Sequence, residues 1–317
     1  MNKRNIGLSE LNIAPWMLGG NVFGWTIGAE QSFHVLDAFT SAGFNSIDTA
    51  DAYSTWVPGN QGGESETIIG QWFQKRKNRS GIILATKVGS TMPRSPKKIL
   101  KKAYILKAVE DSLRRLQTDY IDLYQSHYDD PETPVEETLE AYWTLIKSGK
   151  VRYIGASNFS PGRLVESINT SKTLHLPGYV SLQPQYNLYD RADYEANYAK
   201  ICQEQQLGVI PYYSLASGFL SGKYRDKADL DKSKRGSGID KYLDNRGFSI
   251  LQAMDEVAER HHCSLAAIAL AWLMARPGIT APIASATKVE QVKQLAKAAT
   301  IKLSGAELEL LNNASAY

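Results

Sequence analysis

Cysteine is scarce in this sequence of 317 residues, which contains only Cys202 and Cys263. Two cysteines so far apart exclude a disulfide framework and do not suggest a metal site, so we expect no bound metal. Long hydrophobic runs are also missing. The longest, from Ala266 to Met274, ends at Arg276 and falls well short of the roughly 20 residues of a membrane span. With no secretory leader after Met1, we expect a protein of the reducing cytoplasm with no membrane partner.

A large excess of charge of one sign is absent too, because 36 basic residues face 33 acidic ones and the net charge is only +3. The densest basic cluster, Lys97-Lys98 with Lys101-Lys102, fits the solvated start of a helix, and we expect no nucleic-acid partner. The hydrophobic content of 43% is that of an ordinary globular protein. The length suits either two domains or one large barrel.

Short apolar segments alternate with amphipathic segments along the whole chain. The predicted strands are 15–19, 44–48, 82–87, 121–127, 152–157, 180–185, 208–213 and 279–285. The predicted helices are 31–41, 64–77, 97–116, 135–148, 161–171, 192–206, 249–261, 264–275, 288–298 and 304–313. The first dozen residues, with Gly7 and Asn12, are typical of a hairpin. We therefore predict an α/β fold, a single-domain (β/α)8 TIM barrel over residues 1–317, with an N-terminal hairpin cap and extra C-terminal helices.

A doubly wound sheet is the alternative α/β architecture for such an alternating chain. It is usually marked by a Gly-x-Gly-x-x-Gly turn after the first strand. Here the first strand ends in Leu18-Gly19-Gly20-Asn21, which has adjacent glycines and not the spaced set. A dinucleotide, if one is bound, would be held without the Rossmann motif.

Polar residues follow three successive predicted strands: Asp48 and Tyr53 after the second, Lys87 at the end of the third, and His127 at the end of the fourth. In a barrel these four converge at the C-terminal mouth, where chemistry is placed. A lysine ammonium favours a nearby phenolate and lowers the pKa of the phenol, while an aspartate keeps the lysine charged. A neutral histidine can donate a hydrogen bond to a carbonyl oxygen as negative charge develops on it. The set is suited to protonating an oxygen while another agent supplies hydride to carbon.

Each of the four residues has a structural interpretation when taken alone. Asp48 could cap a helix or pair with a base, and Lys87 could belong to an ion pair. His127 and Tyr53 could be packing residues with one satisfied polar atom. Because all four interpretations would have to hold together, the combination favours a catalytic function.

The chain resembles the aldo/keto reductase superfamily over nearly its whole length. The resemblance lies in Asp48-Thr49-Ala50-x-x-Tyr53, Thr86-Lys87, Asp122-Leu123-Tyr124-x-x-His127, Ile154-Gly155-Ala156-Ser157-Asn158-Phe159, and Gln183 with Tyr186-Asn187 and Tyr212. It implies an (α/β)8 barrel that reduces carbonyl compounds with NAD(P)H. By this likeness Tyr53 is the general acid, Lys87 and Asp48 tune it, and His127 orients the substrate carbonyl.

The resemblance also implies how a nicotinamide cofactor would be held. Ser157, Asn158 and Gln183 would bind the carboxamide, and Tyr212 would stack on the nicotinamide ring. The further cofactor residues are Gly20, Asn21, Asp48, Ser214, Leu215, Ser217, Gly218, Leu220, Lys223, Ser285, Thr287, Lys288, Gln291 and Gln294. Lys288 with the hydroxyls of Ser285 and Thr287 could receive a 2′-phosphate at a helix N-terminus, which favours NADPH over NADH. Many members carry an arginine here, and this chain does not.

The expected partner is a small-molecule carbonyl substrate. The predicted substrate-binding residues are Tyr53 and His127 with the aromatic residues Phe23, Trp25, Trp56 and Tyr128. Each of those aromatics could instead belong to ordinary packing. The chain could act as a monomer or a homo-oligomer.

Two other functions stay open at this point. The first is a cofactor-sensing regulatory subunit like the potassium-channel β subunits, which resemble the same family. The second is an isomerase or lyase without a cofactor, which conflicts with the polar set Ser157, Asn158 and Gln183.

Overall fold

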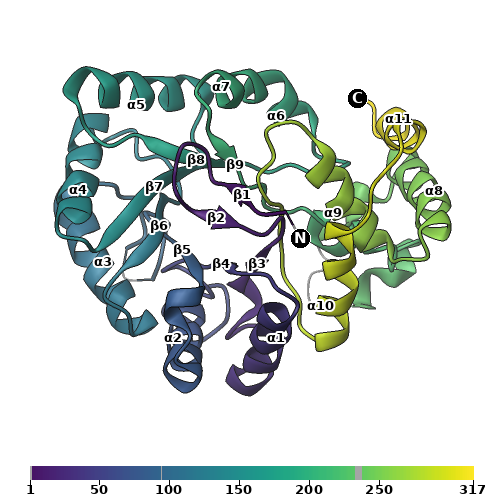
Figure 1. The fold of residues 1–317 in the computed structure, drawn as a ribbon, viewed down its shortest axis with the longest axis horizontal. Helices are drawn as coiled ribbons and strands as arrows, with labels where there is room; N and C mark the ends of the chain where they lie inside the picture. Colours follow the sequence, from purple (N-terminus) through teal and green to yellow (C-terminus); the bar gives the residue numbers. More distant parts are fainter. Residues whose placement is uncertain (1, 94, 233–237) are drawn as a thin grey trace.

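The eight parallel strands of a (β/α)8 barrel form the centre of the computed structural model, which describes residues 2–93, 95–232 and 238–317 (Figure 1). The strand order is β10-β3-β4-β5-β6-β7-β8-β9. The bounds are β3 Met17–Gly19, β4 Ser46–Asp48, β5 Ile83–Val88, β6 Ile121–Ser126, β7 Val151–Ser157, β8 Tyr179–Gln183, β9 Gly208–Val209 and β10 Ile283–Ala284. Hydrogen bonds from Thr280 N to Val209 O (2.8 Å) and from Ile283 N to Pro211 O (2.9 Å) join the two edge strands. The predicted barrel is confirmed.

An antiparallel hairpin closes the N-terminal end of the barrel. It consists of β1 (Arg4–Asn5) and β2 (Asn12–Ile13), and in Figure 1 it lies across the centre of the strands. Ile6, Leu11 and Ile13 pack against apolar side chains of the barrel interior. Gly7 has a φ of +55°, and a Cβ there would lie 2.2 Å from Val180 O, so only glycine fits this turn. This end is apolar and closed, which leaves the opposite end for a polar site.

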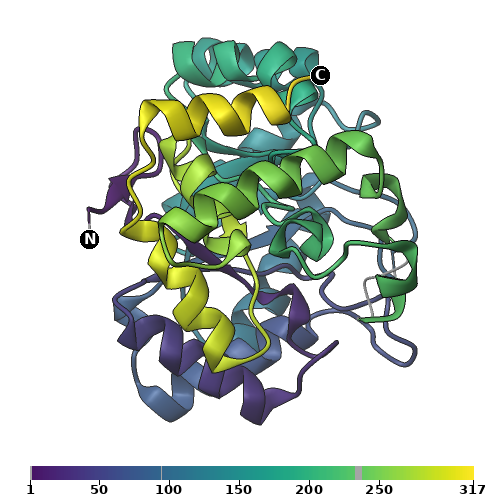
Figure 2. The ribbon, with the colours of Figure 1, turned by 90° about the vertical axis from the view of Figure 1, so that its right-hand side faces the viewer.

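Helices surround the strands (Figure 1). They are α1 Ala29–Ser41, α2 Glu64–Arg76, α3 Lys102–Leu116, α4 Val135–Lys147, α5 Pro161–Leu174, α6 Ala192–Asn197, α7 Ala199–Glu204, α8 Asn245–Arg260, α9 Leu265–Ala275, α10 Val289–Ala296 and α11 Gly305–Ala314. Residues 266–274 of α9 are all buried, which explains why the longest apolar run of the sequence lies there. Figure 2 shows α11 beside α8, so the C-terminal helix packs on the outside of the barrel.

Four predicted elements differ clearly from the structure. The predicted strand 279–285 is reduced to β10, residues 283–284, because Pro282 has no amide to donate to a ladder. Helix α3 begins at Lys102 and not at Lys97, because Leu100 is buried and its amide donates to Asp130 Oδ2 (2.9 Å), which holds the preceding segment as a loop. The predicted helix 192–206 is interrupted at Tyr198, whose hydroxyl donates to Phe159 O (3.0 Å). Strand β9 has two residues, because Pro211 lacks an amide donor and interrupts the ladder, which resumes only as an isolated bridge between Gln185 and Tyr212.

Within the described ranges, every helix is too short or too polar to cross a membrane.

Candidate active site

Three neighbouring strands bring the predicted acid–base residues together at the C-terminal end of the barrel. Asp48 is the last residue of β4, Lys87 lies near the end of β5, and His127 directly follows β6. The register pairs Asp48 with Ala85 and Lys87 with Gln125, so the ends of the strands stay level. Tyr53 follows on the loop after β4, and its hydroxyl reaches Lys87.

Lys87 is the centre of the hydrogen-bond network. Its Nζ donates to Asp48 Oδ2 (2.7 Å), to the backbone oxygen of Thr49 (2.8 Å) and to the hydroxyl of Tyr53 (3.1 Å). The side chains of Lys87 and Asp48 are 0% and 2% exposed. Three acceptors satisfy the three protons of the ammonium, so its position is fixed. A buried charge held in this way is stable only while the opposite charge stays beside it.

Asp48 is itself held from the other side of the barrel. Its Oδ1 accepts hydrogen bonds from Gln125 Nε2 (3.2 Å) and from Gln183 Nε2 (3.0 Å). Gln125 was not predicted, although it lies two residues before His127 and therefore points to the same face of β6. That alternation is the sequence signal that could have identified it.

Burial and charge act in opposite directions on the pKa values of this group. Burial raises the pKa of Tyr53, and the nearby ammonium of Lys87 does not offset that rise. Lys87 lowers the pKa of the phenol, as predicted, but burial outweighs that effect, so the net pKa is raised and the phenol is protonated. Burial on its own would lower the pKa of Lys87, but Asp48 and the Tyr53 oxygen outweigh it and hold that pKa above its usual value. Lys87 is therefore charged.

His127 is neutral in this environment. Burial, reinforced by the charges of Lys87 and Lys98, holds the pKa of its imidazole well below the usual value. Its Nδ1 has no hydrogen-bond partner among the described residues. The ring contacts Tyr53 edge-on (centroids 5.8 Å apart) and stacks on Tyr128 (5.1 Å). A neutral imidazole can donate one hydrogen bond to a neutral substrate.

A cavity of about 870 Å³ opens over this group. Its lining includes most of the predicted site residues: Asn21, Asp48, Tyr53, Trp56, His127, Tyr128, Ser157, Asn158, Gln183, Tyr212, Ser214, Leu215, Ser217, Gly218, Lys223, Ser285, Thr287, Gln291 and Gln294. It also includes Ser90, Thr91 and Tyr213, which were not predicted. The volume and the mixture of aromatic and polar side chains are those of a small-molecule site.

Six predicted residues lie outside this lining, among them Lys87, which is buried beneath it. Phe23 and Leu220 are fully buried in the hydrophobic core, so they pack and cannot line a pocket. Gly20 is also buried, and a Cβ there would lie 2.9 Å from Ser65 Oγ, so its small size serves close packing. Trp25 stands behind Trp56, with ring centroids 5.5 Å apart. Lys288 lines a neighbouring cleft together with Thr287.

The predicted carboxamide-binding residues are already joined to one another. Ser157 Oγ donates to Gln183 O (2.9 Å), and Asn158 Nδ2 donates to His127 O (2.9 Å). The hydroxyl of Tyr212 donates to Asn158 Oδ1 (2.8 Å). Asn158 has a φ of +54°, a left-handed conformation that asparagine tolerates. These bonds fix the positions of the amides at the cavity wall.

The far end of the cavity lies beyond β10, before helix α10. Ser285 Oγ donates to Asn21 Oδ1 (2.5 Å), which ties β10 to the segment after β3. Gln291 Oε1 accepts from the amide of Thr287 (2.7 Å) and from its hydroxyl (3.1 Å). The glutamine side chain thus folds back over the helix start, where the expected anion site would be.

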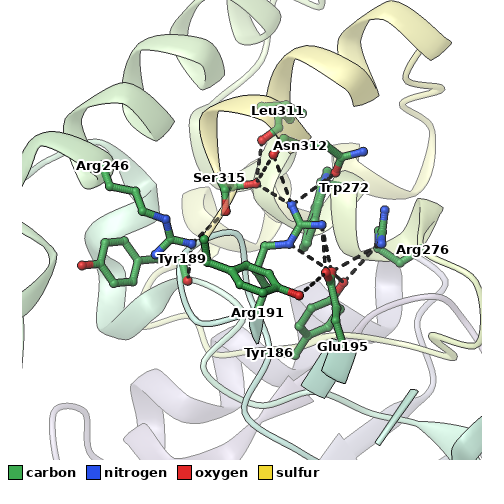
Figure 3. A network of polar contacts seen from close by, with 11 residues as sticks. Tyr186, Tyr189, Arg191, Glu195, Arg246, Trp272, Arg276, Leu311, Asn312 and Ser315 are labelled. Carbon is green, nitrogen blue, oxygen red and sulfur yellow. Dashed lines mark hydrogen bonds and ion pairs between the residues drawn. The ribbon is translucent and has the colours of Figure 1, made fainter. Parts of the chain in front are cut away.

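The segment after β9 is held by side chains from outside the sheet. Asn187 Nδ2 donates to Tyr213 O (2.9 Å), next to the cavity. Asn187 belongs to the loop after β8, and so does Arg191. Arg191 is buried between Glu195 (Nε to Oε1, 3.0 Å) and Ser315 (Nη1 to Oγ, 2.7 Å), which lies at the end of α11 (Figure 3). The C-terminal helix therefore supports the loop that contacts this wall of the cavity.

Comparisons with known proteins agree with this arrangement. The aldo/keto reductase family matches residues 15–316. The chain is 35% identical to the uncharacterized oxidoreductase YrpG of Bacillus subtilis (strain 168), over 97% of this chain and 94% of that protein. It is 32% identical to the aldo-keto reductase YhdN of the same organism, over 92% and 85% of the two chains. A probable voltage-gated potassium channel subunit beta of Arabidopsis thaliana is 29% identical, over 95% and 92%. From its barrel, its sequence and these relatives, the chain belongs to the aldo/keto reductase family of oxidoreductases.

Proposed function

We propose that this protein reduces aldehydes and ketones to alcohols with NADPH, and that Tyr53 donates the proton. The observation that carries this proposal is the buried hydrogen-bonded group of Asp48, Lys87 and Tyr53 at the base of a cavity lined by His127. In such a group the Tyr53 hydroxyl can deliver a proton to an oxygen atom, while the charges of Lys87 and Asp48 stay buried beside it.

The proton transfer from Tyr53 depends on its two buried neighbours. Burial keeps the phenol protonated before reaction. As the proton leaves, negative charge develops on an oxygen that lies 3.1 Å from the ammonium of Lys87. That ammonium stabilises the phenolate, and Asp48 keeps the ammonium in place. Lys87 thus makes a poor acid effective without touching the substrate.

His127 orients the carbonyl oxygen. It is neutral, and its ring lies 5.8 Å from that of Tyr53, so the two side chains can contact the same oxygen atom from different sides. A hydrogen bond from the imidazole polarises the carbonyl and fixes its direction relative to the phenol. Trp56 and Tyr128 flank this position with apolar rings, which contact Tyr53 and His127 respectively.

The residues of the cavity fit a nicotinamide dinucleotide. When bound, the reduced nicotinamide supplies the hydride. Asn158 and Gln183 present amide groups to a carboxamide, and Tyr212 presents its ring to the nicotinamide. Ser217 and Gly218, both with positive φ, allow close approach of the backbone to a pyrophosphate whose charge Lys223 can offset. Thr287 and Gln291 would hold the adenosine end, and Lys288 beside them would favour the 2′-phosphate of NADPH.

A cofactor-sensing subunit is the second candidate. One of the relatives is named as a probable channel subunit, and such a function would need the same cavity. The intact group of Lys87, Asp48 and Tyr53 favours turnover, since binding alone does not require a proton donor. The cytoplasm is the proposed compartment, and a small-molecule carbonyl compound is the proposed partner.

The experiment is a fluorescence titration of the purified protein with NADPH and NADH, followed by oxidation of the bound cofactor with a panel of simple aldehydes. NADPH binding with turnover is the expected result. Binding without turnover on every aldehyde would favour the sensing subunit. If neither nucleotide binds, the reductase proposal is wrong.

A further inference from the structure

Five aromatic rings form a continuous series across the base and rim of the cavity. Trp25 contacts Trp56 edge-on (centroids 5.5 Å apart), and Trp56 contacts Tyr53 edge-on (5.7 Å). Tyr53 contacts His127 (5.8 Å), which stacks on Tyr128 (5.1 Å). The acid–base residues are therefore flanked on both sides by aromatic walls. Such walls suit a flat substrate whose ring packs against theirs.

Trp56 is exposed although it is a large apolar residue. Its exposed fraction is 47%, and that of Tyr213, which also lines the cavity, is 51%. Exposed large aromatic side chains that line a cavity are typical of binding sites. Covering both with an apolar ligand would remove their surface from water.

The loop that carries Trp56 is held in place before any ligand arrives. Glu64, at the start of α2, accepts from the amides of Ser54 (3.2 Å) and Gln61 (2.7 Å). Asn60 Nδ2 donates to Gly24 O and to Ser54 O, each at 3.1 Å. A wall fixed at both ends loses little conformational entropy on binding, so its shape can select the substrate.

Lys98 lies outside the cavity lining but brings a positive charge to Tyr128, which is part of that lining. Its Nζ lies 4.2 Å from the ring centroid of Tyr128. The loop is anchored on either side of it, by the hydrogen bonds between Met92 and Ser95 and by the bond from Leu100 N to Asp130 Oδ2 (2.9 Å). No carboxylate of the described residues forms an ion pair with Lys98, which is exposed at the surface. Its charge is therefore available to a ligand.

Negative charge does not compete for that position. Among the described lining residues, Asp48 and Lys223 alone carry charge. The carboxylate of Asp48 is 2% exposed and bound to Lys87. Near Lys98, the carboxylate of Asp129 is paired with Arg163 (2.9 Å), and that of Asp130 accepts hydrogen bonds from Leu100 N, Glu132 N and Thr133 Oγ1, so Lys98 gives this part of the rim a positive field. Such a field attracts anions and repels cations.

We propose that the substrates are aromatic aldehydes that carry an anionic group, with the ring between Trp56 and Tyr128 and the anion at Lys98. The inference rests on the proposed reductase function. The carbonyl carbon accepts hydride from NADPH and its oxygen accepts the proton of Tyr53, which yields the aryl alcohol and NADP⁺. Tyr128 contacts both the ring of His127 (centroids 5.1 Å apart) and the ammonium of Lys98 (4.2 Å from its ring centroid), so it links the carbonyl-binding residue to the cation.

The test compares 4-carboxybenzaldehyde with its neutral analogue 4-formylbenzamide, which has nearly the same shape. We expect the wild-type protein to show a higher kcat/KM for the carboxylate, mainly through a lower KM. Lys98→Ala and Lys98→Gln should each lower the carboxylate-to-amide ratio about fivefold, as for a partly exposed ion pair. Raising the salt concentration should also lower the carboxylate-to-amide ratio of the wild-type protein, because salt screens the ion pair. Lys97→Ala is the matched control and should keep the wild-type ratio.

The role of the ring is tested separately, with a carboxylate on an aliphatic aldehyde of similar length. Trp56→Ala should lower kcat/KM for 4-carboxybenzaldehyde about tenfold more than for the aliphatic compound. Equal losses for the two compounds would overturn the aromatic part of the inference. A carboxylate-to-amide ratio that Lys98→Ala and Lys98→Gln leave unchanged would overturn its anionic part.

A binding measurement separates this inference from the reductase proposal. Quenching of tryptophan fluorescence by 4-carboxybenzaldehyde, in the presence of NADP⁺, reports binding without turnover. If no aldehyde is reduced but this binding is weakened by Lys98→Ala, the reductase proposal fails and the anion site stands. If 4-formylbenzamide is reduced as well as the carboxylate and binds as tightly, the reductase proposal stands and the anion site is wrong.

Discussion

The two walls of the cavity are built in different ways. One wall comes from the ends of β4 to β8, and its side chains are fixed by the strand ladders and by the buried pair of Lys87 and Asp48. The other follows β9 and β10, which have two residues each. It is held by side chains of the loop after β8. Asn187 donates a hydrogen bond to Tyr213 O, and Arg191 donates one to Ser315 at the end of the C-terminal helix (Figure 3).

The difference separates two tasks of an enzyme of this kind. Proton transfer needs atoms held to within fractions of an ångström, and a parallel sheet supplies that rigidity directly. Binding and release of a large cofactor need a wall that can move, and segments with few ladder hydrogen bonds have lower local stability. Changes at Asp48, Lys87 and His127 in the first wall should therefore affect the chemical step, and changes in the second wall should affect cofactor affinity and stability.

The largest effect is expected from Lys87→Met, in the first wall. Loss of the ammonium removes the stabilisation of the phenolate, so we expect kcat to fall roughly 10³-fold with NADPH affinity nearly unchanged. The variant leaves Asp48 buried without its partner, which costs about 3–5 kcal/mol of stability. The double variant Lys87→Met with Asp48→Asn removes that charge and serves as the control. Near wild-type kcat in the folded double variant would exclude Lys87 from the mechanism.

A smaller effect, on stability, is expected from Arg191→Met in the support of the second wall. The substitution removes the bonds to Ser315 and Glu195, and we expect the free energy of unfolding to fall by about 2 kcal/mol. NADPH affinity should fall several-fold, while the single-turnover rate at saturating cofactor stays close to wild type. Arg114→Met, at an exposed arginine paired with Asp111, is the matched control and should change stability by less than about 0.5 kcal/mol. Urea unfolding and fluorescence titration measure both quantities.

Lys288→Ala tests whether Lys288, next to the second wall, binds the 2′-phosphate of NADPH. We expect NADPH affinity to fall about fivefold and NADH affinity to change little, because the ammonium would contact only the 2′-phosphate. Lys293→Ala, five residues further along the chain and in the last turn of α10, is the control. An equal loss for both nucleotides, measured by titration, would show that Lys288 does not recognise the 2′-phosphate.

The smallest effect is expected from pH. The pKa of Tyr53 is raised, so the phenol keeps its proton through neutral pH and loses it only when pH rises above about 10. The pKa of His127 is lowered, so its imidazole stays neutral even when the pH falls below the ordinary pKa of histidine. We expect kcat/KM for a neutral aldehyde to stay nearly constant from about pH 6.5 to about pH 9. A profile with a midpoint between these limits, at constant NADPH affinity, would contradict both assignments.

The sequence predicted the first wall better than the second, for physical reasons. Strand-end polar residues such as Asp48, Lys87 and His127 follow apolar segments whose length and alternation identify a strand. The barrel, the hairpin cap and the gathering of these residues could therefore be predicted. The net direction of the pKa shift of Tyr53 could not, because it depends on how much water the fold excludes.

The second wall depends on contacts that no local pattern encodes. Arg191 and Ser315 are 124 positions apart in the chain, and their hydrogen bond follows only from the packing of α11. The predicted strand 208–213 is too long because Pro211 interrupts the ladder and the left-handed residue Tyr213 ends it. Phe23 was predicted at the substrate site, but its apolar ring is equally suited to the core, where it lies.

The central claim is that Tyr53 supplies the proton for carbonyl reduction, and single-turnover kinetics of Tyr53→Phe test it most directly. With NADPH bound before mixing with aldehyde, we expect cofactor affinity close to wild type and a rate of NADPH oxidation at least ~10²-fold lower, because only the hydroxyl is lost. A wild-type rate in this variant would contradict the account and remove Tyr53 from the mechanism.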